Sequence, residues 1–277
     1  MPELPEVETT LRGIEPWLVN RTIRAIEVRD SRLRWPVPDA VGKAVGQQVL
    51  SLQRRAKYML INLANGCLLI HLGMSGSMRV LPGDTDQHEQ EKHAPGKHDH
   101  FDILVDGCTI RFNDPRRFGC FLWLENPAME HPLLAALGPE PLSDEFSGKY
   151  LYQRSQGRKL AVKNFIMDGK VVVGVGNIYA SEALYMAGIH PLRAAGKISI
   201  ARYEGLESAI RDVLARAIRQ GGTTLRDFTS SDGSPGYFAQ ELLVYGRAGQ
   251  DCFQCSAKIR QKVIGQRSSY YCINCQH

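Results

Sequence analysis

Short runs of branched and aromatic residues dominate the first half of the chain and predict a β-rich domain. Gly, Asn, Asp and Pro separate these runs, as they do at turns between strands. The pattern covers five segments: TIRAIEVRD, VLSLQRRAKYMLINL, GCLLIHLGMSGSMRVL, HFDILVDGCTIRFND and GCFLWLE. It is typical of a β-sandwich or a barrel. Residues 82–98 form a polar stretch without apolar periodicity, which we expect to be an exposed loop.

Helical periodicity occurs at the N terminus and again in the second half. Val7, Leu11, Ile14 and Leu18 predict a short amphipathic helix, and Pro5 suits its first turn. A passage rich in proline and acids, residues 132–147, ends the strand pattern and is expected to be an interdomain linker. Beyond it, helices are predicted in IYASEALYMAG and in IARYEGLESAIRDVLARAIRQGG, where two glycines end the second. The second helix has an expected apolar stripe of Ile200, Tyr203, Leu206, Ile210, Val213, Leu214 and Ile218.

Composition excludes several classes of protein. Of 277 residues, 43% are apolar and 23% are charged, which is ordinary for a globular protein and does not fit collagen, a coiled coil or a disordered chain. No apolar run reaches the roughly 18 residues of a membrane span, and the opening MPELPEVETT does not resemble a secretory signal. A cytoplasmic protein is therefore expected. The net charge of +5 favours an anionic partner only weakly.

The seven cysteines form two groups. Cys67, Cys108 and Cys120 are scattered through apolar stretches, and an odd total without a signal peptide indicates thiols and metal ligands and not disulfides. The other four have the spacing of a structural zinc site, in which four thiolates close a tetrahedral shell without an open position for catalysis. These four ligands are Cys252, Cys255, Cys272 and Cys275. One structural Zn²⁺ is the expected cofactor.

The segment between the cysteine pairs, SAKIRQKVIGQRSSYY, predicts a β-hairpin that turns at Gly265. The tail from Glu241 onward holds five Lys or Arg residues against two acids. A hairpin that presents Arg260, Lys262 and Arg267 suits contact with phosphates or a nucleic-acid groove. A small protein-binding ribbon is the alternative.

The N terminus is a candidate catalytic centre. Removal of Met1 is expected before the small Pro2, which would expose a secondary amine that attacks a sugar C1′ and forms an iminium. The positive end of the predicted helix favours the free base, and Glu3 and Glu6 stand beside it as candidate proton shuttles. The alternative is a capping segment with solvated acids, which are common in first turns.

Ten segments, in order and over nearly the whole chain, resemble the bacterial formamidopyrimidine-DNA glycosylase family. They are MPELPEVETTLRGIEPWL, RRAKYML, HLGMSG, KHDH, NDPRRFG, GPEPLS, VVVGVGNIYASEALY, GGTTLRDF, SPGYFAQELLVYGR and the four-cysteine ribbon. The resemblance implies a bifunctional repair enzyme that excises 8-oxoguanine and formamidopyrimidines from duplex DNA and cuts the strand by β,δ-elimination. A silent binder of damaged DNA and a relative that prefers oxidised pyrimidines remain alternatives. The implied enzyme acts as a monomer in the bacterial cytoplasm, associated with the nucleoid.

The resemblance also implies roles for individual residues. Pro2 would be the nucleophile and Glu3 the proton donor, while Lys57 would assist β-elimination and Arg267 the δ step and the grip on a phosphate. The physical alternative for Lys57 is one cation in a run on an exposed strand face. A wedge of Met74, Arg116 and Phe118 would hold the duplex open when the nucleotide is extruded; core positions are the alternative for the methionine and the phenylalanine. The implied DNA-contacting set is Glu6, His71, Met74, His98, Arg116, Phe118, Arg158, Lys163 and Asn177.

Three further expectations concern the second half of the chain. Asn177 is expected to cap a helix that begins at Ile178, whose free N–H groups suit a phosphate. GGTTLRDFTSSDGSPGYF resembles the family's lesion-recognition loop, and Asn164 stands where the family commonly has proline. No spacing supports a second metal site at His88 and His93.

The resulting fold prediction is α+β. It has an N-terminal β-sandwich with a helix at 1–131, the linker at 132–147, a helical domain with a helix-two-turn-helix motif at 148–240 and a zinc-finger hairpin at 241–277.

Overall fold

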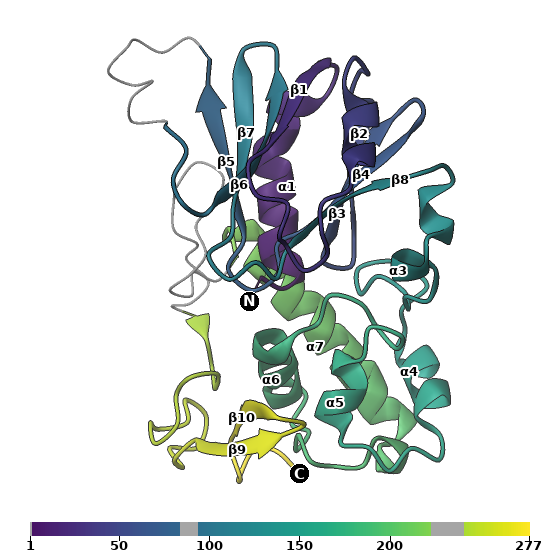
Figure 1. The fold of residues 1–277 in the computed structure, drawn as a ribbon. Coiled ribbons are helices and arrows are strands. Elements are labelled where there is room, and N and C mark those ends of the chain that lie inside the picture. The colour runs from purple at the N-terminus through teal and green to yellow at the C-terminus, as the bar shows by residue number, and fades with distance from the viewer. Residues whose placement is uncertain (1, 84–93, 223–240) are drawn as a thin grey trace. The chain divides into compact units, whose positions relative to one another are not determined.

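The computed structural model describes residues 2–83, 94–222 and 241–277. These residues have the predicted α+β architecture, with two β-sheets, several helices and a C-terminal hairpin (Figure 1). They divide into two compact units. The sandwich unit runs to Ala135 and also includes Gly221 and Gly222, and the helical unit comprises Ala136–Gln220 and residues 241–277.

Two four-stranded antiparallel sheets build the sandwich unit. The first has the order β1 (Ile23–Val28), β6 (Asp99–Val105), β7 (Cys108–Asn113), β5 (Ser77–Pro82). The second has the order β2 (Ser51–Arg55), β3 (Tyr58–Leu63), β4 (Gly66–His71), β8 (Cys120–Leu124). These eight strands lie within the five segments predicted from sequence or within one residue of them, so the prediction of a sandwich is confirmed.

The sandwich core lies between the sheets and under the first helix. Phe101 of β6 stacks on Phe121 of β8 with ring centroids 4.0 Å apart, which joins the two sheets. Helix α1 (Leu4–Leu18) packs against β2, β3 and β5. Since β2 and β5 are edge strands of different sheets, the helix covers the side where these two edges lie. All four residues of its predicted apolar stripe are buried. Each such side chain contributes about 1.5–3 kcal/mol of transfer free energy. Short helices η1 (Asp39–Ala44), η2 (Ala128–Glu130) and α3 (Pro132–Ala135) complete the unit.

The helical unit contains α4 (Gly148–Ser155), α5 (Val162–Met167), α6 (Asn177–Met186), η3 (Ala195–Lys197) and α7 (Ile200–Arg219). Helix α7 packs against α4 and α6, and most of its predicted stripe is buried. Two members of the stripe are corrected: Ile200 is exposed and Ile218 is only half-buried. Ala209 and Ala217 are buried in the same helix. Ile200 is exposed because it is the first residue of α7, where the helix begins. Ala209 and Ala217 are buried because small residues suit positions where neighbouring helices approach closely.

A C-terminal hairpin of β9 (Arg260–Ile264) and β10 (Arg267–Tyr271) completes the unit. Its turn residues Gly265 and Gln266 have φ values of 56° and 63°, as a type I′ turn requires. The predicted hairpin and its turn are therefore confirmed. None of the described helices is long and apolar enough to cross a membrane.

Candidate nucleic-acid interface and metal site

The start of α1 buries two carboxylates beside Pro2. Glu3 and Glu6 are each 2% exposed and form a reciprocal capping box, in which Glu6 Oε2 accepts the Glu3 amide N–H at 2.8 Å. These acids are buried, which contradicts the alternative of a solvated capping segment. A Cβ added to Gly222, at φ 80°, would lie 3.1 Å from Glu6 Oε1, so the chain passes close to this carboxylate. Met1 lies outside the described residues.

Lys57 lies in the tight turn between β2 and β3 and is half-buried, so the alternative of an exposed strand face is wrong. Arg54 of the same hairpin donates to Glu8 Oε2 at 2.8 Å, which ties the hairpin to α1. The charge of Lys57 acts on His71 at the end of β4. Lys57 and His71 therefore lie close enough in the sandwich unit for the charge of the lysine to act on the imidazole.

His71 is a neutral donor. Burial, followed by the charges of Lys57 and Arg34, lowers the pKa of His71 to about 4. Its Nδ1 accepts the Gly73 amide N–H at 2.9 Å, so the proton of the neutral ring is on Nε2. The ring is therefore suited to donate one hydrogen bond at neutral pH and adds no charge there.

The three predicted wedge residues occupy two adjoining loops. Met74 is half-buried and Phe118 is 45% exposed, so the alternative of core positions is wrong for both. Arg116 is exposed, and its guanidinium lies over the Phe118 ring at 5.1 Å. At Gly73, with φ 65°, an added Cβ would lie 2.4 Å from the Phe118 carbonyl carbon, so the two loops touch through their backbones.

Asp114 fixes the shape of these loops. The residue is fully buried, and its carboxylate accepts from the Ser75 hydroxyl at 2.7 Å and from the Gly119 amide at 2.8 Å. The Arg116 amide donates to it at 3.2 Å. One buried acid therefore holds both loops that carry the wedge.

A cavity of about 710 Å³ opens beside the wedge. Sequence reasoning missed three of its arginines, Arg32, Arg34 and Arg117. The alternating basic run RLRWP was the available signal for the first two. Arg34 lies over the Trp35 ring at 4.9 Å, and this cation–π contact holds its guanidinium at the cavity. The remaining lining residues are Leu33, His71, Gly73, Met74, Arg116 and Phe118.

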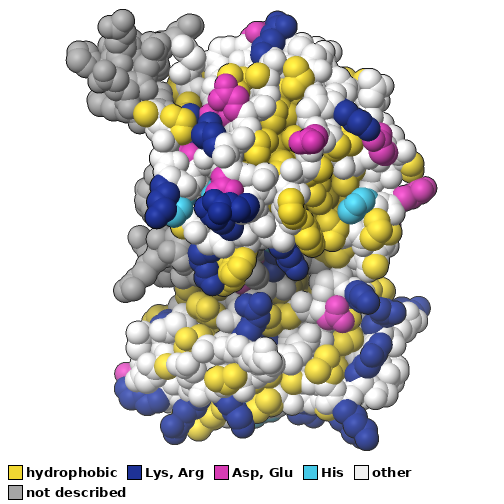
Figure 2. Space-filling model, in the orientation of Figure 1, with side chains coloured by type: hydrophobic (Ala, Val, Ile, Leu, Met, Phe, Trp, Pro, Cys, Tyr) yellow, Lys and Arg dark blue, Asp and Glu magenta, His cyan; other side chains and the backbone are white. Residues whose placement is uncertain are grey.

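The other predicted DNA contacts lie in separate places. His98 is half-buried in a second, polar cavity, and its carbonyl accepts the Asp114 amide at 3.0 Å, which links it to the wedge loop. Arg158 is exposed between α4 and α5 in the helical unit. Lys and Arg side chains are spread over the face shown in Figure 2. His88, His93 and the predicted lesion-recognition loop, residues 223–238 after the two glycines, lie outside the described residues.

Lys163 and Asn177 form a buried network under the hairpin. Lys163 is 1% exposed, and its ammonium donates to Asn177 Oδ1 at 2.5 Å and to Ser269 Oγ at 2.6 Å. Asn177 Nδ2 donates to the Ser268 carbonyl at 3.0 Å. The predicted cap is wrong: Asn177 is the first residue of α6, Gly176 is the N-cap, and the Asn177 side chain turns to β10. The network supports the strand that begins with the exposed Arg267.

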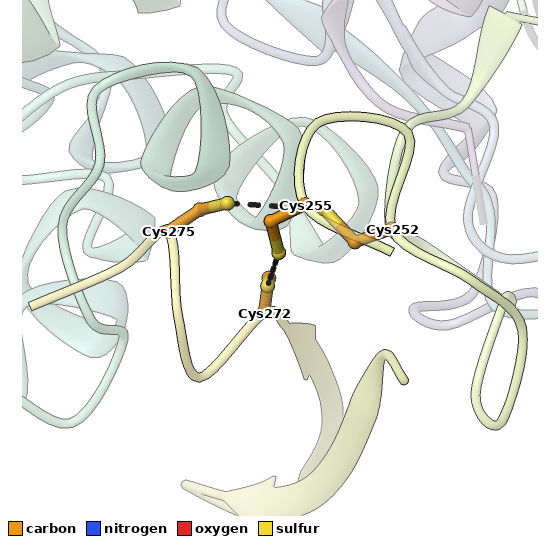
Figure 3. A group of neighbouring side chains, drawn as sticks. All are labelled: Cys252, Cys255, Cys272 and Cys275. Atoms are coloured by element: carbon orange, nitrogen blue, oxygen red, sulfur yellow. Dashed lines mark hydrogen bonds between the residues drawn. The ribbon is translucent and has the colours of Figure 1, made fainter. Parts of the chain in front are cut away.

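The four predicted ligand cysteines converge on one point (Figure 3). Their sulfur atoms all lie within 4.8 Å of one another, with Cys252 to Cys275 at 3.9 Å and Cys255 to Cys272 at 3.4 Å. Tetrahedral Zn–S bonds of about 2.3 Å require sulfur atoms about 3.8 Å apart, so this donor set fits the metal. By contrast, burial raises the pKa of the Cys67 and Cys120 thiols to about 12, which keeps them protonated.

Two family models match the chain. The formamidopyrimidine-DNA glycosylase N-terminal domain matches residues 1–121, and the formamidopyrimidine-DNA glycosylase H2TH domain matches residues 137–229. Curated proteins named formamidopyrimidine-DNA glycosylase are similar over the full length of both chains. Those of Syntrophotalea carbinolica and Alcanivorax borkumensis are each 59% identical to this chain.

Solved structures agree with these matches. The MutM (Fpg) protein of Thermus thermophilus is 35% identical, with a TM-score of 0.87 over 99% of this chain and 98% of that chain. A Lactococcus lactis Fpg mutant in complex with a Fapy-dG containing DNA is 28% identical, with a TM-score of 0.89 over 100% of both chains. The similarity therefore covers both units.

Proposed function

The chain belongs to the formamidopyrimidine-DNA glycosylase family, and from this premise we propose that it excises oxidised purines and then cuts the strand at the abasic site. It is a base-excision repair glycosylase, and its partner is duplex DNA that contains 8-oxoguanine, formamidopyrimidines or abasic sites. The observation that carries the residue-level proposal is the burial of Glu3 and Glu6 beside Pro2. Buried acids next to a nucleophile are typical of proton-transfer sites.

The first step is the attack of the Pro2 amine on C1′ of the damaged nucleotide. The N–C1′ bond forms as the glycosidic bond breaks, and the departing base takes the electron pair of that bond together with a proton. Glu3 is the proton donor of the ring-opening step that leaves an iminium. Glu6 holds the Glu3 amide through its 2.8 Å hydrogen bond, so its own contribution is to orient the segment.

Strand cleavage follows from the iminium, which acidifies the C2′ proton. Loss of this proton expels the 3′ phosphate in β-elimination, and a second elimination expels the 5′ phosphate. Lys57 is proposed to assist the first elimination and Arg267 the second. Lys57 lies in a tight turn beside His71, and Arg267 begins a strand supported by the Lys163 network.

Extrusion of the nucleotide is the task proposed for the wedge. Phe118 is exposed and therefore available to enter the base stack, while Arg116 above its ring can donate to the orphaned opposite base. Asp114 keeps both loops in place, which lowers the cost of ordering them on DNA. His98, Arg158 and Asn177 are proposed as further contacts to the DNA backbone.

We propose that the four cysteines bind one Zn²⁺. The metal would supply a structural cross-link and no reacting group, because four thiolates fill its tetrahedral shell. Its ligands come from the turns on either side of the hairpin that carries Arg267.

The enzyme is proposed to work as a monomer in the bacterial cytoplasm, on nucleoid DNA. The expected divisions at 1–131, 132–147, 148–240 and 241–277 are kept as the proposed functional domains.

Borohydride trapping tests the chemistry. The natural chain should form a covalent adduct on an 8-oxoguanine duplex, because borohydride reduces the iminium. Pro2→Gly and Glu3→Gln should abolish or strongly reduce the adduct. Glu15→Gln is the matched control, since it removes a carboxylate from the same helix away from the N terminus.

Two outcomes would contradict the proposal. Binding of the duplex without an adduct would indicate a silent damage-binding protein. Faster excision of thymine glycol than of 8-oxoguanine opposite cytosine would indicate a preference for oxidised pyrimidines.

A further inference from the structure

Helix α6 holds the C-terminal ribbon, residues 241–277, at three separate positions. At its start, Asn177 donates to the Ser268 carbonyl of β10 at 3.0 Å. In the middle, the Glu182 carboxylate accepts three consecutive amides, those of residues 243–245, at 2.8–3.0 Å. In the last turn, Tyr185 contacts Cys252. The first two contacts hold backbone, but the third reaches an atom expected to bind metal.

The Tyr185–Cys252 contact is buried and short. Tyr185 is 3% exposed and Cys252 is 2% exposed, and the hydroxyl oxygen lies 3.1 Å from the Cys252 sulfur. Both belong to a small apolar cluster with Val244, Ile259 and Cys272. The cluster is apolar, so the hydroxyl is a polar side-chain group placed against the sulfur on this side. The backbone amides of Gln254 and Cys255 also donate to this sulfur.

The direction of this hydrogen bond follows from the chemistry of the ligand. A free thiol and a hydroxyl can each donate, but a sulfur that binds metal is a thiolate and can only accept. The tyrosine hydroxyl has one proton that it can donate, and it lies within hydrogen-bonding distance of the sulfur. In the metal-bound protein the hydroxyl therefore donates to the sulfur.

We propose that Tyr185 is a positioning residue of the zinc site, whose hydroxyl holds the Cys252 thiolate in place and increases the retention of the metal. Four thiolates around one Zn²⁺ carry a net charge of −2, and burying that charge is costly unless donors surround it. A donor in the outer shell offsets this cost and fixes the direction of the ligand. The inference rests on the proposed zinc site and not on the proposed catalysis.

A change of one atom tests the inference. Tyr185→Phe keeps the ring in the cluster and removes the donor. Tyr203→Phe is the matched control, because Tyr203 is also fully buried in the helical unit and donates to the Ala195 carbonyl at 3.0 Å, away from the cysteines. Each variant removes one buried tyrosine hydroxyl, so an effect on zinc confined to Tyr185→Phe does not come from the loss of a buried hydroxyl alone.

The measurement is competition between the intact protein and a chromophoric zinc chelator. Tyr185→Phe should bind zinc about tenfold or more weakly than the natural chain, the usual effect of losing an outer-shell partner. Tyr203→Phe should bind zinc as the natural chain does. Equal zinc affinity in all three proteins would overturn the inference, and so would an equal loss in both variants, which would indicate general destabilisation.

A spectroscopic readout separates the contact from stability. With Co²⁺ in place of zinc, the sulfur-to-metal charge-transfer band should move to longer wavelength in Tyr185→Phe, because a hydrogen bond stabilises the sulfur lone pairs. An unchanged band would refute the contact. Absence of bound zinc from the purified natural chain would overturn both the zinc site and this inference, whereas one zinc with no effect of Tyr185→Phe would overturn the inference alone.

Discussion

Replacing Lys163 by methionine would show whether a buried ammonium supports the hairpin that carries Arg267. Methionine has a similar length and no donor, so it fills the space without a large cavity. The change removes two short hydrogen bonds, to Asn177 Oδ1 and Ser269 Oγ at 2.5 and 2.6 Å, and a longer one to the Ser268 carbonyl at 3.3 Å. Ser269 Oγ also donates to the Arg267 carbonyl at 3.2 Å, but the half-buried Asn177 Oδ1 loses the Lys163 ammonium as its donor.

The magnitude follows from opposing contributions. The two short charge-assisted hydrogen bonds are worth about 1.5–3 kcal/mol each, and the half-buried acceptor on Asn177 costs less than the roughly 1–3 kcal/mol of a fully buried one when it loses its donor. Removal of a buried ammonium also removes its desolvation penalty, which offsets several kcal/mol of this loss of stability. We therefore expect a net loss of about 2 kcal/mol, which corresponds to about a 30-fold larger population of the opened hairpin at 1.4 kcal/mol per factor of ten.

Hydrogen exchange measures this population. Amides of β9 and β10 should exchange about 30-fold faster in Lys163→Met, at 1.4 kcal/mol per factor of ten, while amides of the sandwich unit keep their rates. Lys170→Met is the control, because Lys170 is exposed in the same unit. Unchanged exchange in the hairpin would refute the supporting role.

A double-mutant cycle then shows how Lys163 affects DNA. If it acts by supporting Arg267, Lys163→Met should weaken binding to an abasic-site duplex in the natural chain but add little in an Arg267→Ala background. A full effect in that background would mean that Lys163 contacts the DNA by itself. It should then also lower the slope of log affinity against log salt by about one unit.

Three more predictions follow from other parts of the structure. Phe118→Ala should reduce excision of 8-oxoguanine by about tenfold or more, since unstacking costs a few kcal/mol, and it should impair cleavage of a preformed abasic site less; an equal loss in both assays would contradict the wedge. Hydrogen bonds from Arg29 and Arg111 outweigh burial and lower the pKa of Asp102 below its ordinary 3.8. Asp102 therefore adds stability that is complete above that pH and is lost as the pH falls below it, so Asp102→Asn should flatten acid unfolding below about pH 4; an unchanged pH profile would oppose this. Cys255→Ser should abolish zinc and DNA binding while circular dichroism still reports a folded sandwich unit, and retained DNA affinity would deny the hairpin a role in recognition.

The elements that the sequence predicted best are those with local causes. Runs of branched and aromatic residues between turn residues mark the strands of the sandwich, and the spacing of the four cysteines is set by two short turns and one hairpin. The wedge residues required the family resemblance, because nothing in HLGMSG or NDPRRFG distinguishes an exposed Phe118 from a core phenylalanine. The sequence could not predict that Asp114 orders both loops, because its partner Ser75 is 39 positions away.

Long-range partners explain what the sequence did not predict. The sequence named Lys163 only as a DNA contact implied by the family resemblance, because its acceptor on Ser269 is 106 positions away. The cap expected at Asn177 was wrong because helix starts are uncertain by a residue or two, and one position separates a cap from the first helical residue. Glu182 and Tyr185 gave no signal, because nearly all of α6 is buried and therefore has no polar face.

Because α6 contacts the ribbon at three positions, metal binding depends on Asn177, Glu182 and Tyr185 all facing the ribbon from the same side of the helix. A helix turns by about 100° per residue. Deleting one residue between Asn177 and Glu182 would therefore swing Glu182 and Tyr185 away from their partners while Asn177 kept its own. Such a protein would retain every ligand cysteine and every cation of the ribbon, yet its ribbon would be loosely tethered. A sequence comparison that checks only the four cysteines would classify it as intact.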